Sequence, residues 1–170
     1  PGLNVRILNS ADDRSALLEN AVAGDIVLTS YRLLATEREA LSAIRWNTVC
    51  LDEAHTIKNR SSTTAAAAMS LHARSRLTLT GTPVQNYLGE LWSLFQFLNP
   101  GLLGSYQHFA ERFINTASEE DSRMRRQQLR RIISPFILRR TKAEVAEELP
   151  EKTDIIRRIV LSDSERTGYE

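Results

Sequence analysis

The sequence contains a single cysteine, Cys50, and no apolar run that approaches the length of a membrane-spanning helix. One cysteine cannot form a disulfide within the chain, so we expect its thiol to pack as a small buried hydrophobic group. The first residues lack the pattern of a signal peptide. The formal net charge is only +1, so overall charge does not predict a nucleic-acid partner. These absences favour a soluble intracellular protein that does not enter a membrane.

A second absence concerns nucleotide binding. The sequence contains no G-x-x-x-x-G-K-[ST] pattern, and none of its 7 glycines is followed by lysine. Such a loop is the cradle for the phosphates of a bound nucleotide. These residues therefore do not supply that cradle. The chain also begins at Pro1 without a methionine, so we expect a piece of a longer protein.

The 170 residues have the composition of a globular protein, with 42% hydrophobic and 25% charged residues. In the first half, short apolar runs alternate with helical patterns, which predicts βαβ units in a parallel sheet with helices on both faces. After residue 86, apolar residues recur at helical spacing, and an acidic turn precedes an arginine-rich helix that ends at Pro135. The fold class is thus α/β followed by a mostly helical part. Strands are expected at residues 3–8, 26–28, 49–51, 76–80 and, as a strand or extended connector, 155–161; helices are expected at about 12–22, 31–44 and 62–73.

Two adjacent carboxylates, Asp52 and Glu53, close the third predicted strand. Chemistry collects at the carboxyl ends of parallel strands, and buried carboxylates are unfavourable unless they are paired or bind a cation. The pair follows the logic of a Walker B element, in which the first acid holds Mg²⁺ and the second activates water. Two solvated acids at a strand end are the simpler alternative. His55 completes the tetrapeptide DEAH and either packs in the core or bridges Glu53 to the next strand end.

The fourth predicted strand leads into a run of hydroxyls and amides, LTGTPVQN. Its glycine permits a tight turn, and its threonines and side-chain amides offer polar groups close to the DEAH strand end. A plain turn followed by a helix cap at Asn86 is the alternative. The residues concerned are Thr80, Gly81, Thr82, Gln85 and Asn86.

DEAH followed by LTGTPVQN resembles the Swi/Snf-type DNA translocases, which are helicase-like ATPases of superfamily two. Val84 is a mild departure from the family pattern, whereas DEAH-box RNA helicases carry a short Ser-Ala-Thr in place of the second motif. The resemblance extends over most of the chain and implies a partial RecA-like parallel sheet flanked by helices, followed by a helical insertion. Four further stretches carry it: DIVLTSYRLL, ELWSLFQFLNPGLLGSYQHFAERF, SPFILRRTKAEVAEELPEK and LSDSERTGYE.

This resemblance implies roles for individual residues. Asp52 would coordinate Mg²⁺, and Glu53 would be the catalytic base for ATP hydrolysis. Phosphate contacts from hydroxyl groups position a DNA strand without reading its sequence, as a translocase requires. The residues that would couple nucleotide state to DNA and lobe movement are His55, Thr80, Gly81, Thr82, Gln85 and Asn86. Those that would contact DNA are Thr29, Ser30, Tyr31, Arg139, Arg140 and Lys142.

The resemblance also divides the chain into the carboxyl-terminal part of a first ATPase lobe (1–86), a helical insertion (87–148) and a linker toward a second lobe (149–170). The full-length parent is expected to translocate on double-stranded DNA and to remodel or displace DNA-bound proteins, using ATP, Mg²⁺ and a second lobe in cis. It would act in the nucleus if eukaryotic, or in the cytoplasm or nucleoid if bacterial. The chain alone is expected to be inactive, with an open sheet edge beside the Thr80 strand. A non-catalytic DNA- or protein-binding module and an RNA helicase fragment are the alternatives.

The arginine-rich helix has two interpretations that the residues leave open. Its arginines form either a phosphate-binding face or a solvated face that the acids at 119–121 partly neutralise. The arginines concerned are Arg123, Arg125, Arg126, Arg130 and Arg131.

Overall fold

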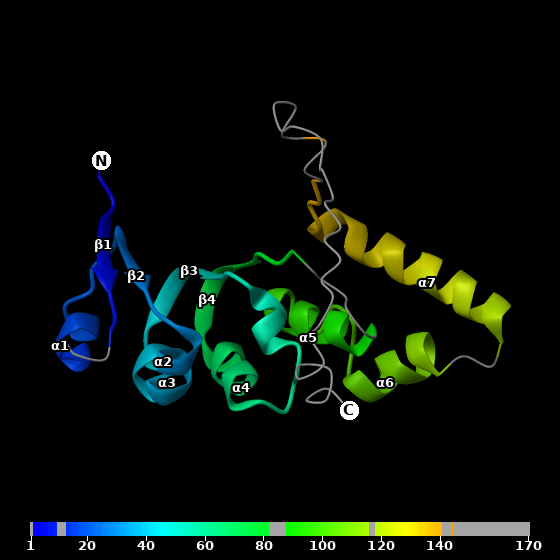
Figure 1. The fold of residues 1–170 in the computed structure, drawn as a ribbon, viewed down its shortest axis with the longest axis horizontal. Coiled ribbons are helices and arrows are strands. Elements are labelled where there is room, and N and C mark those ends of the chain that lie inside the picture. Colours follow the sequence, from blue (N-terminus) through cyan, green and yellow to red (C-terminus); the bar gives the residue numbers. More distant parts are fainter. Residues whose placement is uncertain (1, 10–12, 82–87, 116–117, 141–143, 145–170) are drawn as a thin grey trace, which may run out of the picture. The chain divides into compact units, whose positions relative to one another are not determined.

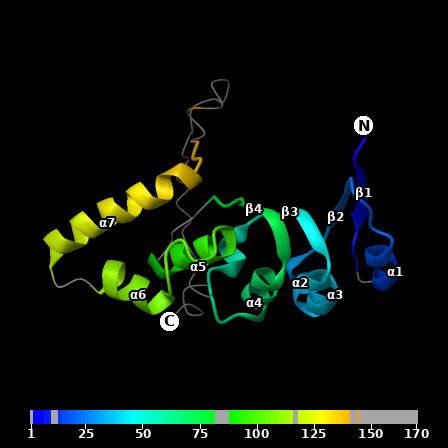
Figure 2. The ribbon, with the colours of Figure 1, turned by 180° about the vertical axis from the view of Figure 1, so that it is seen from behind.

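The computed structural model describes residues 2–9, 13–81, 88–115, 118–140 and 144. They divide into two compact units, Pro1–Ile132 and Ile133–Glu170. Figure 1 shows the elements coloured along the chain, and Figure 2 shows them from behind. All four described strands lie in the first unit. The predicted division at residues 86 and 148 stays a prediction.

The strands form two parallel pairs. Strand β1 (Asn4–Ile7) pairs with β2 (Asp25–Leu28), and β3 (Arg45–Leu51) pairs with β4 (His72–Thr78). Helix α1 (Arg14–Glu19) connects the first pair and α4 (Thr63–Ser70) lies between the strands of the second, which is the predicted βαβ order. Strand β4 begins four residues before the predicted one and ends before Thr80. Its polar first half is a strand because it pairs with β3, a contact that the apolar pattern does not reveal.

The helices of this part are shorter than predicted. Helix α1 (Arg14–Glu19) is capped by the Asp13 side chain, whereas the predicted caps, Ser10 and Asp12, lie outside the described residues. The segment predicted as one helix over 31–44 is two helices, α2 (Tyr31–Thr36) and α3 (Arg38–Ala43). The Thr36 hydroxyl donates to the Leu33 carbonyl, a local bond that competes with continuation of the helix. Helix α4 (Thr63–Ser70) is capped by Ser62, one of the two predicted residues.

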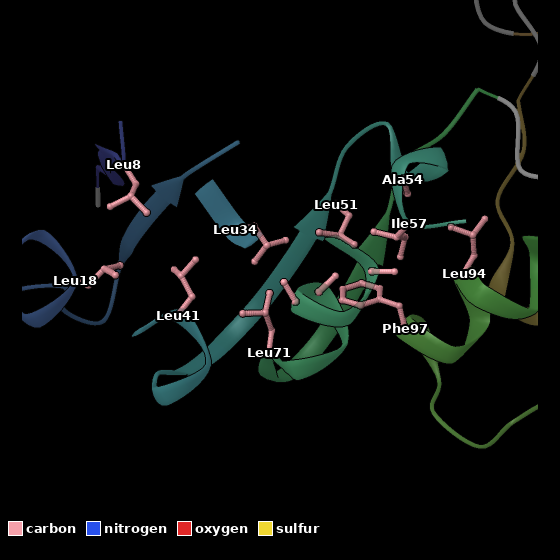
Figure 3. Close-up of a cluster of buried hydrophobic side chains, with 13 residues drawn as sticks. Leu8, Leu18, Leu34, Leu41, Leu51, Ala54, Ile57, Leu71, Leu94 and Phe97 are labelled. Carbon is pink, nitrogen blue, oxygen red and sulfur yellow. The ribbon is translucent and has the colours of Figure 1, made fainter. Parts of the chain in front are cut away.

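A buried apolar cluster joins the two strand pairs to the helices (Figure 3). Three alanines of α4 are at most 1% exposed, because their small side chains let the helix approach the strands closely. Phe97 of α5 (Leu88–Leu98) and Ile57, which follows the DEAH motif, are fully buried in the same cluster. The core therefore reaches from the first strand pair to the first helix of the helical part. Its labelled members include Leu8, Leu18, Leu34, Leu41, Leu51, Leu71 and Leu94.

Helices α1 to α4 lie on one side of the strands in both views, and not on both sides as predicted for the sheet (Figures 1 and 2). Alternate residues of a strand point to opposite faces, so half of each strand faces away from these helices. Cys50 lies on that open face and is exposed, which corrects the expectation of a buried thiol. The apolar residues there are 38–60% exposed: Val5, Ile7, Ile26, Leu28, Leu77 and Leu79.

The rest of the first unit is helical, as predicted. Helix α5 (Leu88–Leu98) ends at the predicted Asn99 stop, and its predicted cap, Asn86, lies outside the described residues. Helix α6 (Tyr106–Phe109) continues as a π-helical turn, η2 (Ala110–Ile114). Helix α7 (Glu119–Ile133) starts at the acids that were predicted to form a turn. Acidic side chains are favourable in the first turn because they face the positive end of the helix dipole.

In the second unit the description covers residues 133–140 and 144. A 3₁₀ turn, η3 (Ser134–Phe136), follows α7 with Pro135 near its start, which confirms the predicted end of the arginine-rich helix. Residues 137–140 have no regular structure and are exposed. The predicted strand at 155–161 lies outside the described residues. Across the described part of the chain, no helix is long and apolar enough to cross a bilayer.

Candidate functional site at the strand ends

The carboxyl ends of β3 and β4 are held side by side beyond their regular pairing. The amide of Leu79 donates to the Leu51 carbonyl at 2.8 Å, and the amide of Ala54 donates to the Leu79 carbonyl at 2.9 Å. These bonds continue the ladder into the DEAH segment. They place the residues before Thr80 directly beside Asp52 and Glu53, as the two motifs predicted.

Glu53 has a left-handed backbone, with φ of 46° and ψ of 49°. Among the described residues other than glycine, Glu53 alone has a positive φ. This conformation is unfavourable by about 1–2 kcal/mol for an L-residue, so the surroundings must hold it. The Glu53 amide donates to Asp52 Oδ1 at 2.9 Å, and its carbonyl accepts from the Thr56 amide and hydroxyl.

The turn after Glu53 is anchored in the core. It is a short 3₁₀ helix, η1 (Ala54–Ile57), and both of its terminal residues are fully buried. The Glu53 side chain, by contrast, is 68% exposed. The strained turn thus directs the Glu53 carboxylate outward, and the buried residues Ala54 and Ile57 hold the turn in place.

His55 lies beside the Glu53 carboxylate, with 3.2 Å between its Nδ1 and Glu53 Oε2. Its side chain is 47% exposed, so it is not the packed core histidine that the sequence left open. The contact orients the carboxylate from one side. The predicted bridge from His55 toward Thr80 stays a prediction.

Tyr31 connects the end of β2 to the DEAH strand end. Its hydroxyl donates to the Asp52 carbonyl at 2.7 Å. Burial, and secondarily the negative charges of Asp52, Cys50 and Glu53, raise the pKa of Tyr31 to about 12. The phenol therefore stays protonated near neutral pH and keeps donating this hydrogen bond.

The two other hydroxyl residues of this strand end lie beside Tyr31. Ser30 caps α2, because its Oγ accepts a hydrogen bond from the Leu33 amide at 3.3 Å. A hydroxyl that accepts a bond can still donate one, so the cap does not exclude a phosphate contact. Thr29 is exposed. The structure thus brings all three predicted DNA-contact hydroxyls together at one strand end.

Two cavities flank that strand end. The first, of about 400 Å³, lies between the ends of β2 and β3 and is lined by Thr29, Ser30, Tyr31 and Asp52 above an apolar floor. The second, of about 750 Å³, shares Thr29 and Ser30 and is also lined by Arg32. Arg32 is exposed and was not among the predicted site residues. Its position directly after the Thr-Ser-Tyr run is the signal that would have identified it.

Several predicted residues are not placed at this site by the described structure. Gly81 is described, and a side-chain carbon there would meet nothing within 4 Å, so close packing does not require the glycine. Arg139 and Arg140 are exposed and belong to the second compact unit. Outside the described residues lie Thr82, Gln85, Asn86 and Lys142.

The donor set at the DEAH turn suits a hard cation. Within the described residues no group of three or more histidine, cysteine or acidic side chains could enclose a metal ion. Asp52 and Glu53 nevertheless offer two exposed carboxylates at one strand end. Mg²⁺ is commonly held by one or two carboxylates together with water and substrate phosphates, so these two residues fit it.

Comparison with known proteins gives a match along the whole chain. The model of the SNF2-related domain family matches residues 1–170. The putative ATP-dependent helicase/translocase YwqA of Bacillus subtilis is 44% identical over 161 residues, which are 94% of this chain and 17% of that protein. The ISWI chromatin-remodeling complex ATPase ISW2 of Saccharomyces cerevisiae is 35% identical over 173 residues, covering 99% of this chain and 15% of that protein. The chain thus spans less than a fifth of the length of these relatives.

Solved structures agree with the fold. The Sulfolobus solfataricus SWI2/SNF2 ATPase core in complex with dsDNA superposes with a TM-score of 0.70 and 39% identity, over 82% of this chain and 29% of that one. The Sulfolobus solfataricus SWI2/SNF2 ATPase core domain gives a TM-score of 0.67 and 36% identity, over 87% of this chain and 30% of that one. These similarities confirm the predicted RecA-like α/β fold.

Proposed function

Because this chain belongs to the SNF2-related domain family, we propose that it is part of the motor of an ATP-dependent translocase on double-stranded DNA. The full-length parent would couple ATP hydrolysis to DNA movement and thereby remodel or displace DNA-bound proteins. One observation carries the proposal: Tyr31 joins the hydroxyl-bearing end of β2 to the DEAH strand end through Asp52. The proposed DNA-contact residues and the proposed hydrolytic residues are therefore mechanically connected.

Glu53 has the geometry of a general base for water. Its carboxylate is exposed and contacts His55, and the turn that carries it is anchored by buried residues. A base must reach the water from which it takes a proton, and an outward carboxylate on a rigid support meets that need. Asp52 would hold Mg²⁺, which when bound would neutralise charge on the nucleotide phosphates.

Thr29 and Ser30 would donate hydrogen bonds to DNA phosphates. A shift of these two residues would be transmitted to Asp52 through the hydrogen bond from the Tyr31 hydroxyl. Phosphate contacts of this kind hold a duplex without selecting a sequence. The proposed coupling residues at the other strand end are His55, Thr80, Gly81, Thr82, Gln85 and Asn86. Arg139, Arg140 and Lys142 would contact DNA or a second lobe supplied by the parent. Residues 1–86, 87–148 and 149–170 would be the lobe, insertion and linker parts.

The assignment of Glu53 is tested in the full-length protein with Glu53→Gln. Glutamine keeps the size and hydrogen-bonding capacity but cannot take a proton, so DNA-stimulated ATP hydrolysis should fall by at least 10²-fold, the usual contribution of a general base. Glu39→Gln, an exposed residue of α3, is the matched control. Hydrolysis at the wild-type rate by the Glu53 variant would remove Glu53 as the base.

The chain by itself should not hydrolyse ATP, because it carries no phosphate-binding loop. Calorimetric titration with Mg-ATP should show no binding in the millimolar range or tighter. Tighter binding would mean that these residues form a nucleotide site without that loop. Stimulation of the parent by duplex DNA and not by RNA would distinguish the proposed translocase from an RNA helicase.

A further inference from the structure

The five arginines of α7 do not form a single surface. Arg125 is half-buried, and its Nη1 donates to the carbonyls of Glu111 at 3.1 Å and Arg112 at 2.9 Å. Leu129, one helical turn further along, is only 3% exposed. This side of α7 therefore faces protein, and Arg125 holds it against the π-helical turn η2.

Arg123, Arg126 and Arg130 lie on a different face of the helix. Their spacing of three and four residues aligns them along one side, and we call them the arginine stripe. All three are exposed. Within the described part of the chain, none of the three forms an ion pair or a hydrogen bond. The packing of Arg125 fixes the rotation of α7, so the stripe has a defined direction.

Of the stripe, the acids at the start of α7 reach mainly Arg123, and they leave the charges of Arg126 and Arg130 largely unneutralised. Glu119 is the acid on the same side, and it lies four residues before Arg123. With a rise of about 1.5 Å per residue, Arg126 and Arg130 are about 10 and 16 Å from it along the axis. These separations exceed the screening length of about 8 Å at physiological ionic strength. The acids instead occupy the helix start, where they interact with the helix dipole.

We propose that the arginine stripe binds the phosphate backbone of duplex DNA, as a contact separate from the Thr29–Tyr31 strand end. The inference rests on the proposed function, which supplies the ligand. The stripe covers about 10 Å of helix axis, and one DNA strand carries a phosphate about every 3.4 Å of its own axis. About three phosphates therefore face three guanidinium groups, each of which can hold a phosphate through two parallel hydrogen bonds.

The surroundings of the stripe fit the same ligand. A concavity of about 300 Å³ is lined by Glu119, Ser122, Arg123 and Arg126, which places one hydroxyl donor and one carboxylate beside two guanidinium groups. Ile133 is aligned with the stripe but is buried, and the exposed aligned positions carry no large apolar side chain of the kind that anchors a protein partner. The parent would thereby hold DNA through its helical insertion as well as through the lobe.

The test measures how DNA affinity of the 170-residue chain depends on salt. A labelled 30-base-pair duplex is titrated by fluorescence anisotropy across a sodium chloride series, and the slope of log affinity against log salt counts the phosphates contacted. The variant is Arg126→Gln with Arg130→Gln. The matched control is Arg45→Gln with Arg74→Gln, two exposed arginines at the starts of β3 and β4. Glutamine retains helix propensity, and circular dichroism checks the fold.

The stripe variant should lower the magnitude of the slope by about 2, whereas the control should leave it almost unchanged. A stripe variant with the wild-type slope would overturn the proposal that the arginine stripe binds DNA, but it would leave the proposed function unaffected. An equal decrease in both variants would also overturn it, since the effect would then be one of total charge. Failure of the wild-type chain to bind the duplex would overturn both the stripe and the DNA contact of the lobe residues.

Discussion

Lys58 and Glu90 form an ion pair in the protein interior. Lys58 Nζ lies 3.1 Å from Glu90 Oε2, and the two side chains are only 8% and 9% exposed. The distance is that of an ion pair, but the angles do not make it a hydrogen bond. Lys58 directly follows the 3₁₀ turn of the DEAH segment, and Glu90 lies in the first turn of α5. The pair therefore ties the base of the Glu53 turn to the helical part of the chain.

Removing one charge of this pair should destabilise the chain strongly. Lys58→Met keeps the length of the side chain but leaves the Glu90 carboxylate buried without its cation, which typically lowers the free energy of unfolding by about 3–5 kcal/mol. Urea denaturation followed by circular dichroism measures the change. Adding Glu90→Leu should recover most of the loss, because a buried apolar pair can replace an ion pair. The exposed Glu39→Gln variant should stay within about 0.5 kcal/mol of the wild type. If Lys58→Met were as stable as the Glu39→Gln control, the pair would not be buried.

Glycine at position 53 should stabilise the chain. Glycine adopts the left-handed conformation without the steric penalty, so Glu53→Gly should raise the free energy of unfolding by about 1 kcal/mol. The same change at Glu39, inside α3, should lower it by about 1 kcal/mol, since glycine is a poor helix former. Changes of opposite sign in the free energy of unfolding at the two positions would identify backbone strain at Glu53. A destabilised Glu53→Gly variant would count against it.

The raised pKa of Tyr31 predicts a stability effect at high pH. Its folded pKa of about 12 lies above the ordinary tyrosine pKa of 10.0, so the protonated phenol is favoured in the folded state. This contribution to stability is complete below pH 10 and is lost as the pH rises from 10 to 12.

A difference titration measures this pKa directly. The tyrosinate absorbance of the wild type minus that of Tyr31→Phe isolates one phenol, and we expect a midpoint near pH 12. The absorbance should be read within milliseconds of a pH jump, before the chain unfolds. A midpoint near pH 10 would show that the hydroxyl is neither buried nor held by Asp52. Tyr31→Phe should also lower the free energy of unfolding at pH 7 by about 1 kcal/mol through the lost hydrogen bond.

The exposed Cys50 should react in the native chain. A thiol reagent such as DTNB should modify it at a rate of the same order as in denaturant, because the side chain lies on the open face of β3. Strong protection would mean that another surface covers this face. Cys50→Ser should abolish the reaction and leave the fold unchanged, which makes it the control.

Much of the fold was predictable because its signals are local. Alternating apolar runs and helical patterns indicated βαβ units, and Ser62 and Asn99 marked the start of α4 and the end of α5. The extent of β4 was not predictable, since its polar first half becomes a strand only by pairing with β3. The break between α2 and α3 was missed because the apolar pattern runs on across Glu37, the residue that ends α2 and precedes α3.

By itself, the sequence determined that carboxylates close one strand and that a hydroxyl and amide run follows the next, because residue order alone places groups at strand ends. Only the tertiary structure decided how they are held. The left-handed Glu53, the bond from Tyr31 to Asp52 and the pair of Lys58 with Glu90 depend on residues brought together by folding. The same holds for the arginines of α7, since a helix has the same composition however it is rotated. Packing sets that rotation, and so it decides which arginines face protein and which face solvent.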